Sequence, residues 1–68
     1  MLGFIGTGNM ASAIIKGVLS SGLLKGEEIG VYDLQSEKAQ DLSAEYGVKT
    51  FSSASELTES CEKIVLSV

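Results

Sequence analysis

The chain has 68 residues, 44% of them hydrophobic, and a formal net charge of −4. A chain of this length forms one small domain at most, and it buries only about 60% of the surface that it exposes when unfolded. It has five lysines and no arginine, so it lacks the basic surface that nucleic-acid binding needs. Its apolar runs are far shorter than the ~20 residues of a membrane span. We therefore expect a globular protein whose partners include neither nucleic acid nor membrane.

The chain has a single cysteine, Cys61, and no histidine, which leaves no set of residues at metal-ligand spacing. Cys61 has no basic neighbour that would activate it, so we expect a structural thiol. Met1 leads directly into an apolar segment, without the basic start and small-residue cleavage site of a secretory signal. These features favour a reducing, cytoplasmic setting.

Strand-like and helix-like segments alternate from the start of the chain. Leu2–Ile5 is an apolar run that ends at a glycine, which predicts a buried strand; Gly3 within it allows close approach of another segment or has no special role. Residues 9–21 show helical spacing of apolar residues, and Gly22 is placed to end that helix. Gly17 interrupts it, and we expect the reason to be close packing on the sheet or on a later element. The expected buried stripe consists of Met10, Ala13, Ile14, Val18 and Leu19.

The middle of the chain repeats this alternation. Ile29–Tyr32 is a second predicted strand, and it ends at Asp33. Ser36–Tyr46 is a second predicted helix with one apolar stripe, and Gly47 provides its end. Val48–Phe51 is a third, weaker strand.

Two further elements close the chain. Ser53 and Glu56 match the spacing of a capping box, which predicts a short helix through about Thr58. Lys63–Val68 then contains an unbroken apolar row. Such a row is typical of a central parallel strand that is covered on both faces.

This order, strand and helix three times and then a strand, predicts an α/β fold. Right-handed crossovers make it a Rossmann-type parallel sheet with helices on both faces and strand order 3-2-1-4. A doubly wound fold normally continues with further strands or a second domain. We therefore expect residues 1–68 to be the amino-terminal part of a Rossmann domain, whose remainder is absent from this sequence.

The main chemical signal is a G-x-G-x-x-A turn between the first strand and the first helix. Gly6 permits a tight turn, Gly8 lets the backbone approach a pyrophosphate, and Ala11 keeps the helix near the sheet. Free N–H groups at the helix start favour the negative charge of a dinucleotide diphosphate. A lone glycine pattern is weak evidence, but this one follows a strand and opens a helix. The residues predicted to bind the cofactor here are Gly6, Thr7, Gly8, Asn9, Met10 and Ala11.

Asp33 follows the turn at about the 20-residue spacing of a ribose-binding acid. Its carboxylate would accept the ribose hydroxyls of NAD and repel the 2′-phosphate of NADP, unless it is an ordinary surface aspartate. Ser36 and Lys38, at the start of the second helix, could instead hold that phosphate, so the sequence favours NAD without excluding NADP. Ser67 and Val68 would line the crevice where a dinucleotide lies, although Val68 fits a core position equally well.

No residue of the chain is a candidate catalytic acid or base. There is no histidine, and the lysines are scattered singly along the chain. Hydride transfer needs little from the protein beyond holding the nicotinamide against the substrate. The substrate-binding groups are therefore expected outside this chain.

The run Gly3–Ala11, G-F-I-G-T-G-N-M-A, resembles the opening of pyrroline-5-carboxylate reductases. The resemblance continues through A-I-I-K-G at 13–17, Y-G-V at 46–48 and the apolar strand at 64–68, so it spans almost the whole chain. It implies an enzyme that reduces 1-pyrroline-5-carboxylate to L-proline with NAD(P)H, in proline biosynthesis. The family pairs its Rossmann domain with a carboxy-terminal helical domain that dimerises, so the resemblance implies a homo-oligomer.

By the same resemblance, Gly6–Ala11 would hold the cofactor diphosphate, and Ser67 and Val68 would approach the nicotinamide. Two departures matter. Asp33 stands where many members carry a small polar residue suited to NADP, and the chain ends before the lysine and proline of the family's strand-end motif. Two alternatives stay open, namely a related β-hydroxyacid or imine dehydrogenase and a non-catalytic domain that senses NAD(H).

Overall fold

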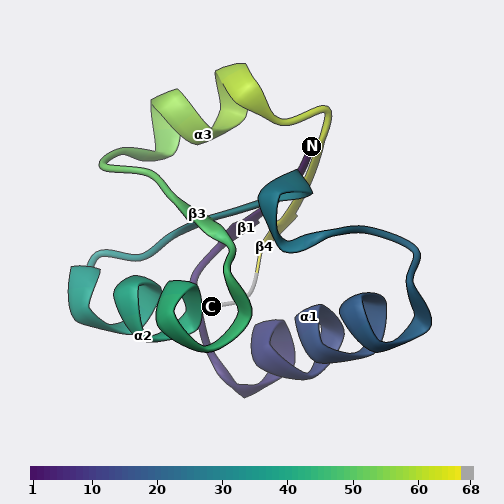
Figure 1. Cartoon of the computed structure of the whole chain (residues 1–68). Coiled ribbons are helices and arrows are strands. Elements are labelled where there is room, and N and C mark those ends of the chain that lie inside the picture. Colours follow the sequence, from purple (N-terminus) through teal and green to yellow (C-terminus); the bar gives the residue numbers. More distant parts are fainter. Residues whose placement is uncertain (67–68) are drawn as a thin grey trace.

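The structure, a computed structural model, describes residues 1–66. They form a parallel sheet in the order β3-β2-β1-β4 with helices on both faces (Figure 1). This confirms the predicted α/β class and strand order. In chain order the elements are β1 (Leu2–Ile5), α1 (Asn9–Ser21), the 3-10 helix η1 (Gly26–Glu28), β2 (Ile29–Tyr32), α2 (Ser36–Tyr46), β3 (Lys49–Thr50), α3 (Ala54–Ser60) and β4 (Lys63–Leu66).

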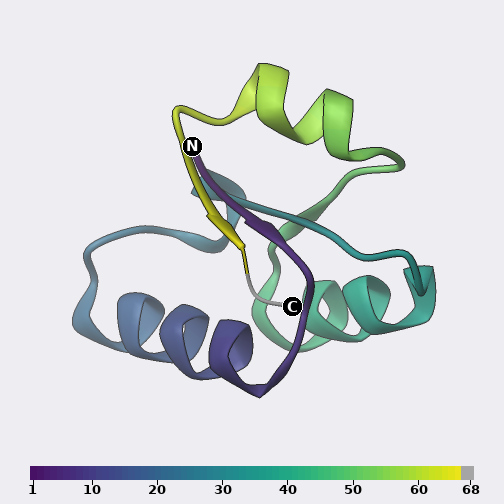
Figure 2. The same ribbon diagram turned by 180° about the vertical axis from the view of Figure 1, so that it is seen from behind.

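The helices lie in two layers. Both views place α1 and α2 together on one side of the sheet and α3 on the other (Figures 1 and 2). On the α3 side, a Cβ added to Gly3 would lie 2.8 Å from Cys61 Sγ, and one added to Gly30 would lie 2.6 Å from the Phe51 ring. Of the two interpretations that the sequence left open for Gly3, the structure supports close approach of another segment. No helix within residues 1–66 is long and apolar enough to cross a membrane.

The register of the two central strands positions the site. Ile5 of β1 pairs with Tyr32 of β2, so both strands end at the same edge of the sheet. The next residues along the chain, Gly6 and Asp33, consequently lie side by side although they are distant in sequence.

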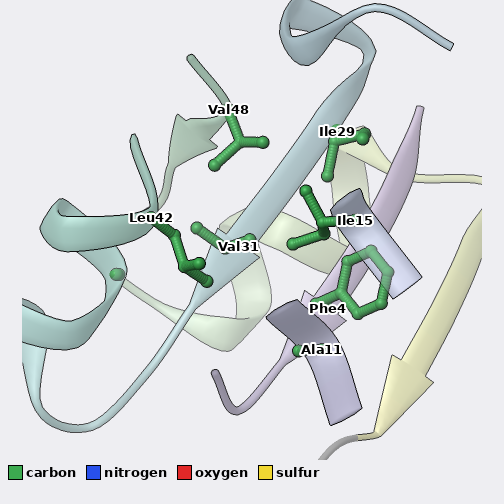
Figure 3. Packing of buried hydrophobic residues seen from close by; sticks show 8 residues of the cluster. Phe4, Ala11, Ile15, Ile29, Val31, Leu42 and Val48 are labelled. Atoms are coloured by element: carbon green, nitrogen blue, oxygen red, sulfur yellow. The ribbon is translucent and has the colours of Figure 1, made fainter. Parts of the chain in front are cut away.

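The main core lies between the sheet and the α1–α2 layer. Figure 3 shows Phe4 of β1, Val31 of β2 and Ile15 of α1 pointing into this space. Each of these three side chains is fully buried. The buried members of the cluster are Phe4, Ala11, Ile15, Ile29, Val31, Ala39, Leu42 and Val48.

The buried face of α1 is rotated by about one residue from the predicted stripe. Ala11 and Ile15 are fully buried, whereas Met10 is 65% exposed and Ala13 is exposed. The prediction for Met10 and Ala13 was therefore wrong. The glycine turn places Ala11 against the sheet. Because residues four apart share a helix face, Ile15 is buried on the same side. Ile14, Val18 and Leu19 are half-buried beside this face.

Glycines end the two long helices as predicted. Gly22 after α1 has φ 76° and Gly47 after α2 has φ 72°, the left-handed conformation that glycine adopts without strain. Gly17 differs from expectation, because a Cβ there would have no atom within 4 Å. It packs on no other element of residues 1–66.

The last three elements, β3, α3 and β4, differ from the prediction in their length or in how far they are buried. Residues 48–51 were expected to form the third strand, but β3 comprises only Lys49–Thr50. The third helix continues past Thr58 to Ser60. Residues 63–68 were expected to form a central strand covered on both faces, but of the part that the structure describes, β4 (Lys63–Leu66), Leu66 is 68% exposed. Within the described residues β4 pairs only with β1, so it is an edge strand of this sheet.

Candidate functional site

The turn between β1 and α1 has the conformation that its glycines predict. Gly6 has φ 92°, which L side chains rarely adopt, and its N–H donates to the Tyr32 carbonyl oxygen at 2.8 Å. Gly8 is extended, with φ −72°, and directly precedes α1. The chain therefore reverses tightly at the carboxyl edge of the sheet and enters the helix beside it.

The amino end of α1 is open to an anion. Its N-cap, Gly8, has no side chain to accept from the helix, and the first turn contains no acidic residue. Ser12 donates its N–H to the Gly8 carbonyl at 3.2 Å, so the amides of residues 9–11 precede the first intrahelical bond. These amides and the helix dipole favour negative charge. By contrast, α3 is capped by Ser53, whose Oγ accepts from the Glu56 N–H at 3.1 Å.

Asp33 is tied to this turn by hydrogen bonds. Its Oδ2 accepts from the Thr7 N–H at 2.9 Å and from the Thr7 hydroxyl at 2.8 Å. Its Oδ1 accepts from the Gln35 N–H at 2.8 Å. The Gln35 bond, the Thr7 bonds and the positive charge of Lys38 outweigh partial desolvation and lower the pKa of Asp33. The carboxylate is consequently ionised at neutral pH.

A hollow of about 130 Å³ adjoins the turn, lined by Ile5, Gly6, Tyr32, Asp33 and Leu34. Leu34 is 90% exposed, so its side chain is accessible to a ligand at this hollow. The structure thus brings Gly6, Thr7 and Asp33 together at one edge of the sheet.

Ser36 lies apart from this hollow. It lines a different one, of about 350 Å³, between α2 and the β3–α3 segment, where Glu56 contributes an acidic group. Glu37 stands in the first turn of α2 next to Ser36. Both acids oppose a phosphate at this position. Ser67 and Val68, the other two predicted cofactor contacts, lie outside the described residues.

Sequence reasoning missed three participants in this geometry. The Thr7 side chain, the Gln35 N–H and Leu34 were not assigned roles. A signal existed for Gln35, because an aspartate commonly accepts from the backbone N–H two residues later in an Asx turn. The Thr7 hydroxyl offered no local signal, since its partner is 26 residues away.

Other chemistry is sparse in residues 1–66. No group of three histidine, cysteine or acidic side chains within them could hold a metal ion. Cys61 is buried, and this burial raises the pKa of its thiol. The raised pKa makes Cys61 a poor nucleophile and agrees with a structural role.

Three curated pyrroline-5-carboxylate reductases illustrate what the chain is similar to. The one from Thermus thermophilus is 38% identical over 53 residues, which cover 78% of this chain and 20% of that protein. The Methanosarcina acetivorans and Escherichia coli enzymes are 30% and 34% identical over 67 residues, which cover 98% of this chain and 25% of each protein. This confirms the resemblance found in the sequence.

The chain thus spans about a quarter or less of the length of these relatives. Residues 1–68 also match, over their whole length, a protein family with the description "NADP oxidoreductase coenzyme F420-dependent". With the Rossmann-type sheet and the glycine turn in place, the chain belongs to this family, as the match over residues 1–68 shows.

Proposed function

We propose that residues 1–68 form the cofactor-binding segment of a pyrroline-5-carboxylate reductase, which reduces 1-pyrroline-5-carboxylate to L-proline with NAD(P)H. The observation that carries this proposal is the uncapped start of α1 at the Gly6–Gly8 turn, where backbone amides are available to an anion. The similarity to reductases of that name supports the choice of substrate.

In this proposal the chain binds and orients the cofactor. The backbone of residues 6–11 holds the diphosphate, and Asp33 accepts from the adenosine ribose. The reduced nicotinamide would supply the hydride that the imine carbon of the substrate accepts, with a proton added at the substrate nitrogen. The groups that bind the substrate lie outside these residues.

We further propose that NAD(H) is preferred over NADP(H), although the family's description names NADP. The ionised Asp33 beside the turn repels a 2′-phosphate. Ser36 and Lys38, at the start of α2, are the residues that could hold that phosphate, but Glu37 is the chain neighbour of Ser36 and Glu56 lines the same hollow. This charge distribution favours a cofactor that ends in two ribose hydroxyls.

Turnover by the full-length protein tests the proposal. We expect oxidation of NADH, measured at 340 nm, when 1-pyrroline-5-carboxylate is added. Gly8→Val should weaken cofactor binding more than tenfold because its side chain blocks the approach of the diphosphate. Gly17→Ala, on the solvent side of α1, is the matched control and should bind as the parent does.

Other outcomes would point elsewhere. Cofactor binding without turnover would favour an NAD(H)-sensing domain, and turnover with a β-hydroxyacid instead would favour a dehydrogenase of that class. Absence of cofactor binding would refute the proposal altogether.

The proposal extends to assembly and location. We propose a homo-oligomer in which a helical domain completes the active site, working in the reducing cytoplasm. Cys61, free and buried, is compatible with a reducing compartment. Sedimentation equilibrium of the full-length protein, which should exceed the mass of one chain, tests the assembly.

A further inference from the structure

The middle residue of the glycine turn reaches across to the acid that follows the second strand. Thr7 is only 9% exposed, and both its N–H and its hydroxyl donate to the same oxygen, Oδ2 of Asp33. The distances, 2.9 Å and 2.8 Å, are typical of good hydrogen bonds to a charged acceptor. We call this pair of bonds the Thr7–Asp33 clasp.

The clasp limits what Asp33 can still accept. An ionised carboxylate offers about four acceptor positions, two on each oxygen. Thr7 occupies two on Oδ2, and the Gln35 N–H occupies one on Oδ1. The remaining position is on Oδ1. A ribose diol would therefore meet a carboxylate that is held in place and open at one oxygen.

Threonine is suited to this task. Its β-branched side chain has restricted χ1 freedom, so its hydroxyl is directed with little loss of entropy. Because the same residue belongs to the turn, the clasp fixes the acid relative to the amides at the start of α1. The ribose-binding carboxylate and the diphosphate-binding amides of the proposed dinucleotide site are thereby held at a fixed distance and orientation.

We propose that Thr7 is a positioning residue that sets cofactor choice, because its clasp holds the Asp33 carboxylate where it accepts one ribose hydroxyl through Oδ1 and repels a 2′-phosphate. The inference rests on the proposed dinucleotide site. It assigns the discrimination between NADH and NADPH to a pair of residues, whereas a purely structural clasp would affect both cofactors equally.

The test compares Thr7→Val, Thr7→Ser, Asp33→Asn and the Thr7→Val/Asp33→Asn double variant of the full-length protein. Fluorescence titration gives Kd for NADH and for NADPH. Thr7→Val removes one charge-assisted hydrogen bond, so the ratio of the NADPH to the NADH Kd should fall about tenfold. Thr7→Ser keeps the hydroxyl and should restore the parental ratio. In the Asp33→Asn background, Thr7→Val should leave the ratio unchanged.

A second measurement follows the clasp directly. Carboxyl-carbon NMR should show a higher pKa for Asp33 in Thr7→Val than in the parent, because the hydroxyl bond that lowers it is lost.

Three results would overturn the inference. The first is that Thr7→Val weakens the binding of NADH and NADPH equally. The second is that Thr7→Val still changes the Kd ratio in the Asp33→Asn background. The third is that Asp33→Asn has the same Kd ratio as the parent, a result that can be obtained even if the Thr7 variants fail to fold. Failure of the parent protein to bind either cofactor would instead refute the proposed function itself.

Discussion

Replacing Gly17 with alanine tests whether the outer face of α1 is free in the folded protein. Glycine inside a helix is less favourable than alanine by about 0.5–1 kcal/mol. A Cβ at Gly17 would meet no atom within 4 Å, so no steric cost offsets this gain. Gly17→Ala should therefore raise the free energy of unfolding by about 0.5–1 kcal/mol.

Gly26→Ala is the matched comparison, with the opposite sign. A Cβ at Gly26 would lie 2.6 Å from the Tyr46 carbonyl oxygen and 2.8 Å from that of Gly47. Both are backbone atoms at the end of α2, and they cannot rotate away as a flexible side chain could. We expect Gly26→Ala to lower the free energy of unfolding by about 1–3 kcal/mol, the usual cost of overpacking.

Urea unfolding of the full-length protein, monitored by far-UV circular dichroism, measures both changes in the free energy of unfolding. They are obtained from the shift of the unfolding midpoint, provided that the slope m stays constant. A Gly17→Ala protein less stable than the parent would refute the reasoning. It would show that a segment beyond residues 1–66 packs on this face of α1. A Gly26→Ala protein as stable as the parent would contradict the close approach of η1 to the end of α2.

Three further predictions concern the site and the core. Asp33→Ser removes the charge that opposes a 2′-phosphate, and the ratio of kcat/KM for NADPH to that for NADH should rise at least tenfold; an unchanged ratio would show that Asp33 does not face the ribose. Because the folded pKa of Asp33 is lowered, its contribution to stability is present above the unfolded value of about 4 and is lost as pH falls through the folded value. The stability difference between the parent and Asp33→Asn, measured by urea unfolding, should accordingly be constant near pH 7 and shrink below about pH 4. Ile15→Ala should cost about 2–5 kcal/mol because Ile15 is fully buried, whereas Met10→Ala should change stability by less than about 0.5 kcal/mol; equal costs would contradict the orientation of α1.

The geometry of the glycine turn and its acid could be predicted in part. The conformation of Gly6 and the helix start at residue 9 followed from the glycine spacing, since glycine alone adopts positive φ without cost. The proximity of Asp33 followed from the parallel order of the strands. Its hydrogen bonds to Thr7 did not, because they depend on the register that places Ile5 beside Tyr32.

The sequence by itself determined the kind and order of the elements. Apolar periodicity and the helix-ending glycines at 22 and 47 act within a few residues, and right-handed crossovers together with the Rossmann pattern favour the strand order 3-2-1-4. Tertiary structure alone decided which face of α1 is buried, how far β4 is covered and that the Thr7 N–H and hydroxyl donate to Asp33. Each of these depends on contacts between segments that are distant along the chain, and the local sequence of neither segment indicates the contact.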